Sequence, residues 1–141
     1  METGDVLAKG LCERIGTGGA ITHKKTGASP YSEEISLPDH STALVRVLDH
    51  LCSSELGVIS SVEEIDAVGH RVAHGGEMLK ESSLITESVV KYLETIVPIN
   101  PLHGPPAIAG IKACLSLMKN VPQVAFFDTS FYSGIEDFRY V

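Results

Sequence analysis

The stretch EIDAVGHRVAHGG, residues 64–76, joins an apolar, strand-like pattern to a charged end that is rich in glycine. Its apolar positions predict a buried strand over residues 64–72; they are Ile65, Ala67, Val68 and Val72. Residues 121–127 form a second short apolar run of the kind found in buried strands. Helical patterns lie between the two runs, and strands that alternate with helices predict an α/β layer fold.

Two helices are predicted between these strands. Thr86 can cap the first helix, and the apolar face of that helix comprises Val89, Val90, Leu93, Ile96 and Val97. The pair Pro105-Pro106 suits the first turn of the second helix, where the N–H groups that proline lacks are not needed. The apolar stripe of this second helix comprises Ile108, Ile111, Leu115 and Met118.

The first third of the chain predicts an antiparallel meander of strands over residues 6–15, 20–25 and 31–37. Residues 16–19, Gly-Thr-Gly-Gly, are expected to form a turn, because they lack the lysine and hydroxyl residue that complete a phosphate-binding P-loop. A helix follows, capped by Asp39 or Ser41 and running to about residue 55. Its apolar stripe comprises Ala43, Leu44, Val47, Leu48 and Leu51.

The composition limits the class of protein. The 141 residues fit one domain, and a hydrophobic content of 43% is enough for a core. The net charge of −7 argues against nucleic acid as a partner, because phosphate backbones select basic surfaces. The three cysteines, Cys12, Cys52 and Cys114, have neither disulfide-framework nor zinc-site spacing. Without a membrane-length apolar stretch or a signal peptide, we expect reduced thiols in a cytoplasmic protein with no membrane partner.

Arg71 is the first candidate for chemistry. In an extended strand, Arg71 and Ala73 lie on one face, and His70, Val72 and His74 lie on the other. Arginine presents a planar fork that matches carboxylate or phosphate, and a small apolar neighbour could accept a short alkyl group. The alternative is a surface arginine in an ordinary ion pair.

His70 and His74 are four residues apart, a spacing that would suit zinc on a helix. The glycines at both ends of this segment argue against a helix there. We therefore expect packed, hydrogen-bonded histidines at these two positions, and we assign no metal ligand.

His103 and Asp128 complete the candidate site. His103 lies among prolines in a loop that opens a helix, where it could donate a hydrogen bond to phosphoryl oxygens or be an ordinary loop residue. Asp128 directly follows the second apolar run, where a carboxylate must be paired, solvated or metal-bound, or else caps a helix or turn. Because the candidates follow strands or open helices, we expect Arg71, His103 and Asp128 to converge on one cleft.

Three motifs in this order resemble signatures of the acetate kinase family. Residues 69–77 resemble the family's Gly-His-Arg-Val-Val-His-Gly-Gly-Glu, and residues 102–106 resemble Leu-His-Asn-Pro-Pro. Residues 127–131 resemble Phe-Asp-Thr-Ala-Phe, and residues 6–16 resemble the stretch after the family's first hairpin. The resemblance covers residues 1–132, which would form part of the family's N-terminal domain, and residues 133–141 form a divergent tail.

The resemblance implies an actin-like α/β fold, shared with sugar kinases and Hsp70 and also called ribonuclease H-like. It implies reversible phosphoryl transfer from ATP to acetate with Mg²⁺, giving acetyl phosphate, in an enzyme that forms homodimers largely through a second domain. Arg71 matches the arginine that holds the carboxylate and the phosphoryl group, and His103 matches the histidine that steadies the transition state. Asp128 matches an acidic residue near the metal, and Ala73 and Leu102 match positions around the methyl pocket.

The chain also departs from the family pattern. Gly104 replaces an asparagine, Ala73 replaces a valine, and Tyr132 stands where the family has histidine. The family's first strand, its Asn-x-Gly-Ser-Ser-Ser loop and its second domain have no counterpart in these residues. We therefore expect a fragment that is inactive alone. The alternatives are a non-catalytic module that binds small carboxylates or phosphates through Arg71 and His103, and a structural remnant.

Overall fold

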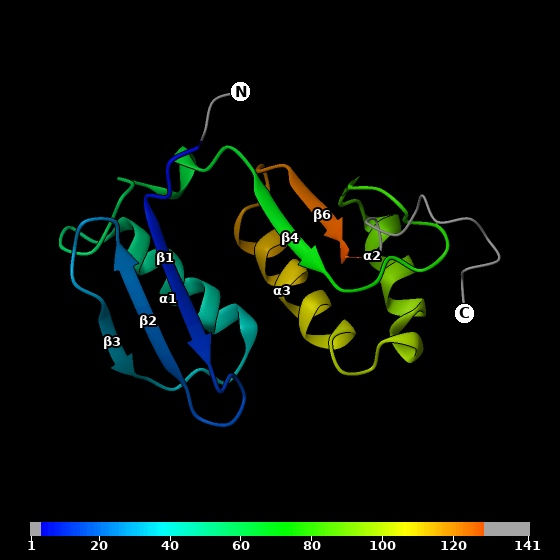
Figure 1. Ribbon diagram of the computed structural model, residues 1–141, viewed down its shortest axis with the longest axis horizontal. Coiled ribbons are helices and arrows are strands. Elements are labelled where there is room, and N and C mark those ends of the chain that lie inside the picture. Colours follow the sequence, from blue (N-terminus) through cyan, green and yellow to red (C-terminus); the bar gives the residue numbers. More distant parts are fainter. Residues whose placement is uncertain (1–3, 129–141) are drawn as a thin grey trace. The chain divides into compact units, whose positions relative to one another are not determined.

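The computed structural model describes residues 4–128, which divide between two compact units with the bounds Met1–Ile65 and Asp66–Val141 (Figure 1). Each unit has its own three-stranded sheet, so each is described by itself. Residues 129–131 of the third motif, Tyr132 and the tail 133–141 lie outside the described residues. Within the described part of the chain, no helix combines the length and the apolar character needed to cross a bilayer.

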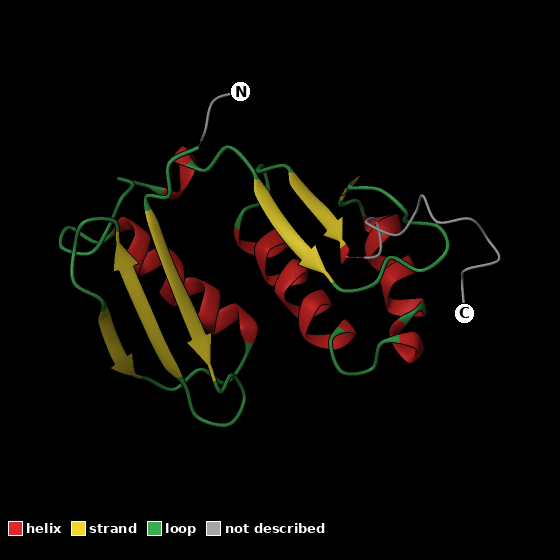
Figure 2. Cartoon of the chain, viewed as in Figure 1, coloured by secondary structure: helices red, strands yellow, loops and turns green. Residues whose placement is uncertain are grey.

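The first unit is an antiparallel sheet with one helix packed against it (Figure 2). The sheet order follows the chain: β1 (Ala8–Glu13), β2 (Ala20–Lys25) and β3 (Tyr31–Glu34). The register pairs Ala8 with Lys25 and Glu13 with Ala20. The predicted meander is confirmed, although the third strand ends at Glu34 rather than at Leu37.

Helix α1 (His40–Cys52) begins where the sequence predicts. The Asp39 carboxylate accepts a hydrogen bond from the Thr42 N–H at 2.7 Å, which satisfies one of the free donors of the first turn. Asp39, and not Ser41, is therefore the N-cap. Among residues 4–65, the buried residues that carry a side chain come from the sheet, the helix and the segment between them: Ile21, His23, Leu37 and Ala43.

The turn between β1 and β2 requires glycine for steric reasons. Gly19 has a φ of 150°, and a Cβ there would collide with the carbonyl oxygen of Ile35 and the side chain of Leu37. The carbonyl groups of the turn hold the chain beyond β3, because Gly19 O accepts from the Ile35 N–H at 3.2 Å and Gly18 O accepts from the Leu37 N–H at 2.8 Å. The interpretation of this glycine-rich segment as a turn is confirmed.

The second unit is a mixed sheet covered by two helices. Its strands are β4 (Val68–Val72), β5 (Ser83–Leu84) and β6 (Gln123–Phe127), in the order β4-β6-β5. Strands β4 and β6 are parallel, with Arg71 opposite Phe126, and β5 is antiparallel to β6. Helices α2 (Glu87–Thr95) and α3 (Gly104–Leu117) form between β5 and β6, as the alternation of strand and helix patterns predicts.

Both helix starts agree with the sequence. The Thr86 hydroxyl accepts a hydrogen bond from the Val89 N–H at 3.3 Å at the start of α2, and prolines occupy the first turn of α3. Two single-turn 3₁₀ helices, η1 (Val62–Glu64) and η2 (Val97–Ile99), complete the elements of the described chain.

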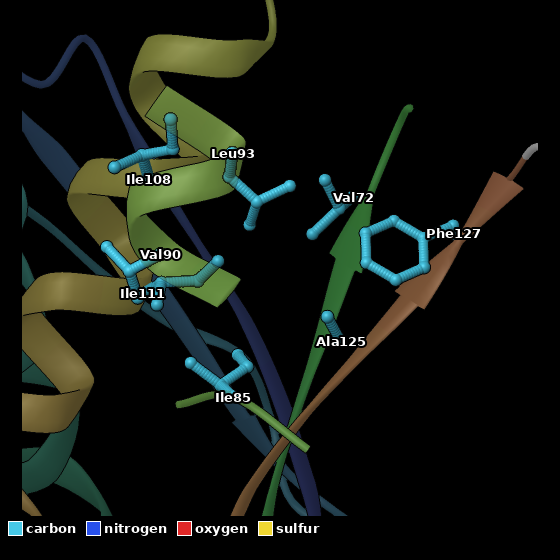
Figure 3. Close-up of a cluster of buried hydrophobic side chains, with 8 residues drawn as sticks. All are labelled: Val72, Ile85, Val90, Leu93, Ile108, Ile111, Ala125 and Phe127. Carbon is cyan, nitrogen blue, oxygen red and sulfur yellow. The ribbon is translucent and has the colours of Figure 1, made fainter. Parts of the chain in front are cut away.

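The core of the second unit lies between its sheet and its helices (Figure 3). It comprises Val72, Ile85, Val90, Leu93, Ile108, Ile111, Ala125 and Phe127. Successive residues of a strand point to opposite faces, so burial of Val72 and Phe127 directs Arg71 and Phe126 to the other face. The apolar core therefore decides the side of the sheet on which Arg71 projects.

Two sequence expectations are wrong in detail. The strand expected over residues 64–72 begins only at Val68, because the Glu64 carboxylate accepts a hydrogen bond from the Ser60 N–H at 2.7 Å within the turn around η1. Neither β4 nor β6 is buried on both faces: Phe126 is 51% exposed, and Arg71 is exposed beside it.

Candidate functional site

Six residues of the second unit line a cavity of about 330 Å³ beside the ends of β4 and β6. They are Arg71, Ala73, His103, Pro106, Ala107 and Asp128. The cavity brings together three polar residues that lie far apart in the sequence, so the expected convergence of Arg71, His103 and Asp128 is confirmed.

Parallel pairing of β4 and β6 explains how Arg71 meets Asp128. Both strands end at the same edge of the sheet, Arg71 lies near the end of β4, and Asp128 immediately follows β6. Arg71 Nε donates to Asp128 Oδ1 and Arg71 Nη2 donates to Asp128 Oδ2, both at 2.9 Å. The two side chains are 83% and 43% exposed, so the fork-shaped pair is open to solvent.

Within residues 4–128, the bidentate pair leaves part of the Arg71 guanidinium free to bind a ligand. Arginine carries five N–H groups, and Asp128 takes one from Nε and one from Nη2 of Arg71. The remaining three are the two on Nη1 and one on Nη2, which form the outer edge of the guanidinium. That edge matches a second planar carboxylate or two phosphoryl oxygens. The ion pair and a bound anion are therefore compatible at Arg71.

The pair also fixes the charge state of the carboxylate. The hydrogen bond from Arg71, assisted by the Coulomb attraction between the two groups, lowers the pKa of Asp128 below its usual value. The same contacts, hydrogen bond first, raise the pKa of Arg71. Both groups are charged at neutral pH, which gives the rim of the cavity one fixed cation and one fixed anion.

His103 is held by its backbone while its ring stays available. It is the N-cap residue of α3; its N–H donates to Asn100 Oδ1 at 3.4 Å, and its carbonyl accepts from the Ala107 N–H at 3.2 Å. Among residues 4–128, neither ring nitrogen of His103 has a hydrogen-bond partner. The imidazole can therefore donate to an anion beside a helix N-terminus, where partial positive charge also favours anions. Sequence reasoning did not identify Asn100.

The apolar wall of the cavity comes from two elements. Ala73 follows β4, and Pro106 and Ala107 lie three and four residues after His103 in α3. Residues at these spacings share one face of a helix, a signal that could have identified both as lining residues. Leu102 differs from the other candidates: its side chain is 81% exposed and does not line the cavity.

His70 and His74 take structural positions outside the cavity. His70 Nε2 is hydrogen-bonded to Gln123 Oε1 at 2.9 Å, and His74 Nδ1 accepts from the Gly76 N–H at 2.7 Å. The expectation of packed, hydrogen-bonded histidines is confirmed. In the described range, 4–128, no group of three or more His, Cys, Asp or Glu side chains could hold a metal ion.

The cysteines are all free thiols, as the sequence predicts. Burial raises the pKa of Cys12 and of Cys114. A raised pKa lowers the thiolate population that a nucleophile needs, so neither thiol is a candidate for covalent chemistry.

Comparison with known proteins identifies a family. The family model described as the Acetokinase family matches residues 1–141. The chain is 49% identical to the acetate kinase of Clostridium acetobutylicum over 141 residues, which is 100% of this chain and 35% of that protein. It is 47% identical to the acetate kinase of Thermotoga maritima with the same coverage. The chain thus spans about a third of the length of the curated relatives it matches.

Solved structures agree with the sequence matches. The crystal structure of Porphyromonas gingivalis acetate kinase matches 98% of this chain at a TM-score of 0.92 and 37% identity, over 35% of its own length. A propionate kinase from Francisella tularensis matches 96% of this chain at a TM-score of 0.83 and 28% identity, over 34% of its own length. The expected fold, that of an actin-like kinase N-terminal domain, is confirmed by this likeness.

Proposed function

This chain belongs to the acetokinase family, and on that premise we propose that it forms the acyl- and phosphoryl-binding part of an acetate kinase. In the proposed reaction an oxygen of the acetate carboxylate forms a bond to the γ-phosphorus of ATP. The bond from that phosphorus to the bridging oxygen breaks, and the electron pair leaves with ADP. The products are acetyl phosphate and ADP, and the reverse reaction uses the same contacts.

Arg71 carries this proposal. Its outer edge offers three N–H groups while its other donors stay on Asp128. A carboxylate and a transferring phosphoryl group both present oxygens with the spacing of that edge. Negative charge is spread over the equatorial phosphoryl oxygens in the transition state, so a fixed cation there stabilises the transition state.

The remaining candidates take supporting roles in the proposal. His103 donates a hydrogen bond from its ring to a phosphoryl oxygen, and Asp128 keeps the Arg71 guanidinium oriented. Ala73 borders the methyl group of acetate, together with the apolar wall of α3. Leu102 is exposed, and we propose that it covers the methyl group only when acetate is bound.

The family implies Mg²⁺ and ATP, and the described residues fit one part of such a site. Mg²⁺ in nucleotide enzymes is held by one or two carboxylates, by substrate phosphates and by water. Asp128 offers one carboxylate at the cavity, and each of its oxygens has a lone pair beyond the one used by Arg71. When bound, the metal supplies positive charge at the phosphates, and Asp128 is the residue that would hold it.

The proposal also covers the domain bounds, the cellular location, the partners and the oligomeric state of the enzyme. We take residues 1–132 as the family-like part and residues 133–141 as a divergent tail. We place the enzyme in the cytoplasm, with acetate and ATP as its substrates and without nucleic acid or membrane as partners. The longer enzyme is a homodimer in this proposal.

A chimera tests the proposed function. Two chimeras are made, in each of which this chain replaces the matching third of the Clostridium acetobutylicum acetate kinase. In the first chimera this chain contributes residues up to 132, and in the second it contributes residues up to 141. Both chimeras are expected to form acetyl phosphate from acetate and Mg-ATP. Arg71→Ala is expected to lower kcat/KM by about 10²–10³, because it removes a charged donor that acts on the transition state.

Arg46→Ala is the matched control, because Arg46 is also exposed and paired with a carboxylate, that of Asp49 at 3.7 Å. It lies outside the cavity and should change kcat/KM by less than about twofold. Equal activity of the two variants would contradict the role of Arg71. A folded chimera that binds acetate without turnover would instead favour the non-catalytic binding module.

A further inference from the structure

A second, smaller cavity of the second unit, the inner cavity, also has His103 in its wall. Its volume is about 20 Å³, which is room for one water molecule. Residues of the apolar core form part of the wall: Val72, Leu93 and Ile108 (Figure 3). The side chains of His74 and Asn100 line the inner cavity as well. His103 is thus the residue shared by the inner cavity and the Arg71 cavity.

The hydrogen bond at His74 fixes which of its ring nitrogens carries a proton. The Gly76 main-chain N–H donates to His74 Nδ1 at 2.7 Å, and a main-chain N–H can only donate. His74 Nδ1 therefore carries no proton, and the proton of the ring is on Nε2. Among residues 4–128, His74 Nε2 has no hydrogen-bond partner. His74 thus offers one unused donor beside the inner cavity.

The side-chain amide of Asn100 is fixed by the same logic. Asn100 Oδ1 accepts from the His103 N–H at 3.4 Å, so the oxygen, and not the nitrogen, occupies that end of the amide. The main chain of Asn100 is held on both sides, because its N–H donates to Val97 O at 3.0 Å and its carbonyl accepts from the Gly104 N–H at 2.9 Å. In the described part of the chain, Asn100 Nδ2 has no partner, so it is a second unused donor.

One water molecule in the inner cavity can join these donors to the His103 ring. A buried water typically makes about three hydrogen bonds. His74 Nε2–H and Asn100 Nδ2–H fill the two lone pairs of the water oxygen, so the water can only donate to His103. The His103 ring nitrogen that accepts this bond carries no proton, which leaves the proton on the other ring nitrogen. That N–H is the donor that the proposed function requires.

We propose that His74 is a positioning residue for His103. Through one bound water it holds the His103 ring in the tautomer that donates to a phosphoryl oxygen. The donors run in one direction, from the Gly76 N–H through His74 and the water to His103, and the direction cannot reverse because a main-chain N–H begins the series. Only the final step, from His103 to the phosphoryl group, rests on the proposed function.

The tautomer of His103 is measured first, on the chain without substrate. Long-range ¹H–¹⁵N NMR at about pH 8.5, where imidazole is ordinarily neutral, distinguishes the protonated from the unprotonated nitrogen of each ring. The signals of His103 are assigned by their loss in His103→Gln. One tautomer should exceed the other by about fivefold or more, because a hydrogen bond selects it. His74→Phe, which keeps a ring but has no donor, should lower that ratio by at least about threefold.

Three further variants separate the donor from the packing of its ring. His74→Gln can accept from the Gly76 N–H and still donate into the inner cavity, so it should keep the tautomer ratio within about twofold. His74→Asn keeps an acceptor for Gly76, but its shorter amide does not reach the cavity; it should resemble His74→Phe and replaces that variant if circular dichroism shows misfolding. His70→Phe is the matched control, because His70 is bonded to Gln123 and lines neither cavity.

The kinetics of the active chimera provide the second measurement. His74→Phe should lower kcat by about tenfold and change the KM for acetate by less than about threefold, because the orientation of His103 acts on the transition state. His74→Gln and His70→Phe should each keep kcat within about threefold.

The two hypotheses fail in different ways. Chimeras that make no acetyl phosphate with the original sequence contradict the proposed function, and the NMR measurement then decides the inference alone. A His103 tautomer ratio that stays the same in the folded His74 variants overturns the inference, whatever the activity. A ratio or a kcat that falls as far in His70→Phe as in His74→Phe, or a His74→Gln variant no better than His74→Phe, overturns it too.

Discussion

At the scale of single residues, the pairing of Arg71 with Asp128 determines what the cavity can bind. A lone arginine on this exposed face would be free to swing, whereas two hydrogen bonds of 2.9 Å hold its guanidinium plane. The cost of ordering the side chain is therefore largely met before a ligand arrives. The ionised Asp128 carboxylate offsets part of the attraction of Arg71 for a second anion, whereas the protonated form would not, so the titration of Asp128 matters.

Asp128 is expected to titrate below the usual aspartate range, because Arg71 lowers its pKa by a hydrogen bond. A depressed folded-state pKa means that the contribution of the pair to stability is present above the usual range and is lost as pH falls through the lowered value. Carboxyl-carbon NMR of the chain measures this titration. Arg71→Ala should raise the pKa of Asp128 toward its ordinary value.

Asp39 serves as the internal control in the same spectra. Its pKa is lowered by the hydrogen bond from the Thr42 backbone, which Arg71 does not touch. The pKa of Asp39 should therefore stay where it is in Arg71→Ala. An Asp128 titration that is equal in the two proteins would show that the ion pair does not form in solution.

Ala73 is expected to control acyl size. In the active chimera, Ala73→Val adds two methyl groups to the apolar side of the cavity that Ala73 lines. Pocket changes of this kind discriminate substrates by about 1–3 kcal/mol per methylene. The variant should therefore lower kcat/KM for propionate more than for acetate. An unchanged propionate-to-acetate ratio would show that Ala73 does not border the acyl group.

At the scale of elements, the β1–β2 turn depends on one backbone position, Gly19, which packs against the segment that follows β3. Gly18 and Gly19 share a φ of 150°, so alanine at either position is strained. Only Gly19 also has neighbours within reach of a Cβ, the Ile35 carbonyl oxygen and Leu37, while Gly18 has nothing within 4 Å. The two substitutions therefore separate backbone strain from collision.

Gly19→Ala is expected to lower the free energy of unfolding by about 1–3 kcal/mol more than Gly18→Ala does, because Leu37 is fully buried and cannot move aside. Urea unfolding followed by circular dichroism gives both free energies of unfolding. Equal losses in the two variants would mean that the Ile35–Leu37 segment moves away without cost.

The elements differ in how far the sequence could predict them. Alternation and turn signals were sufficient for β2, and Asp39 and Thr86 marked helix starts through their side-chain oxygens. The start of β4 was misplaced because the Glu64 carboxylate accepts a hydrogen bond from the Ser60 N–H within one turn, a local contact that the apolar pattern of residues 64–72 does not reveal. Strand β5 has two residues, Ser83 and Leu84, too few for any periodicity to be visible.

The site shows the same division between local and non-local information. Arg71, His103 and Asp128 were found because polar residues at strand ends and helix starts carry a local signal. The Arg71–Asp128 pairing depends on which strands are neighbours in the sheet, and the order β4-β6-β5 is not visible in any single segment. The exposure of Leu102 follows from the path of its loop, which no residue pattern specifies.

At the scale of the whole molecule, the share of the relatives' length that this chain spans limits which parts of the reaction its residues can serve. The chain spans 35% of the acetate kinases it matches, and the Arg71 cavity supplies one guanidinium, one imidazole and one carboxylate. Phosphoryl transfer depends on holding the nucleotide, the metal and the acceptor together in line. In the stretch from residue 4 to residue 128, Asp128 is the one carboxylate at that cavity, and no metal-binding group of three side chains occurs.

We therefore expect the purified chain to form no measurable acetyl phosphate from acetate and Mg-ATP. Ordinary kcat values begin at about 1 s⁻¹, and the turnover of the chain should be below about 1% of that value. A single arginine can bind an anion but cannot by itself orient the attacking and leaving oxygens, and misplacement of the reacting atoms by about 1 Å can cost a hundredfold in rate. Trapping acetyl phosphate with hydroxylamine measures the product, and the active chimera is the positive control. Turnover by the chain alone at an ordinary kinase rate would mean that it holds ATP and the metal without the rest of the relatives' length, and the proposed division of the site would be wrong.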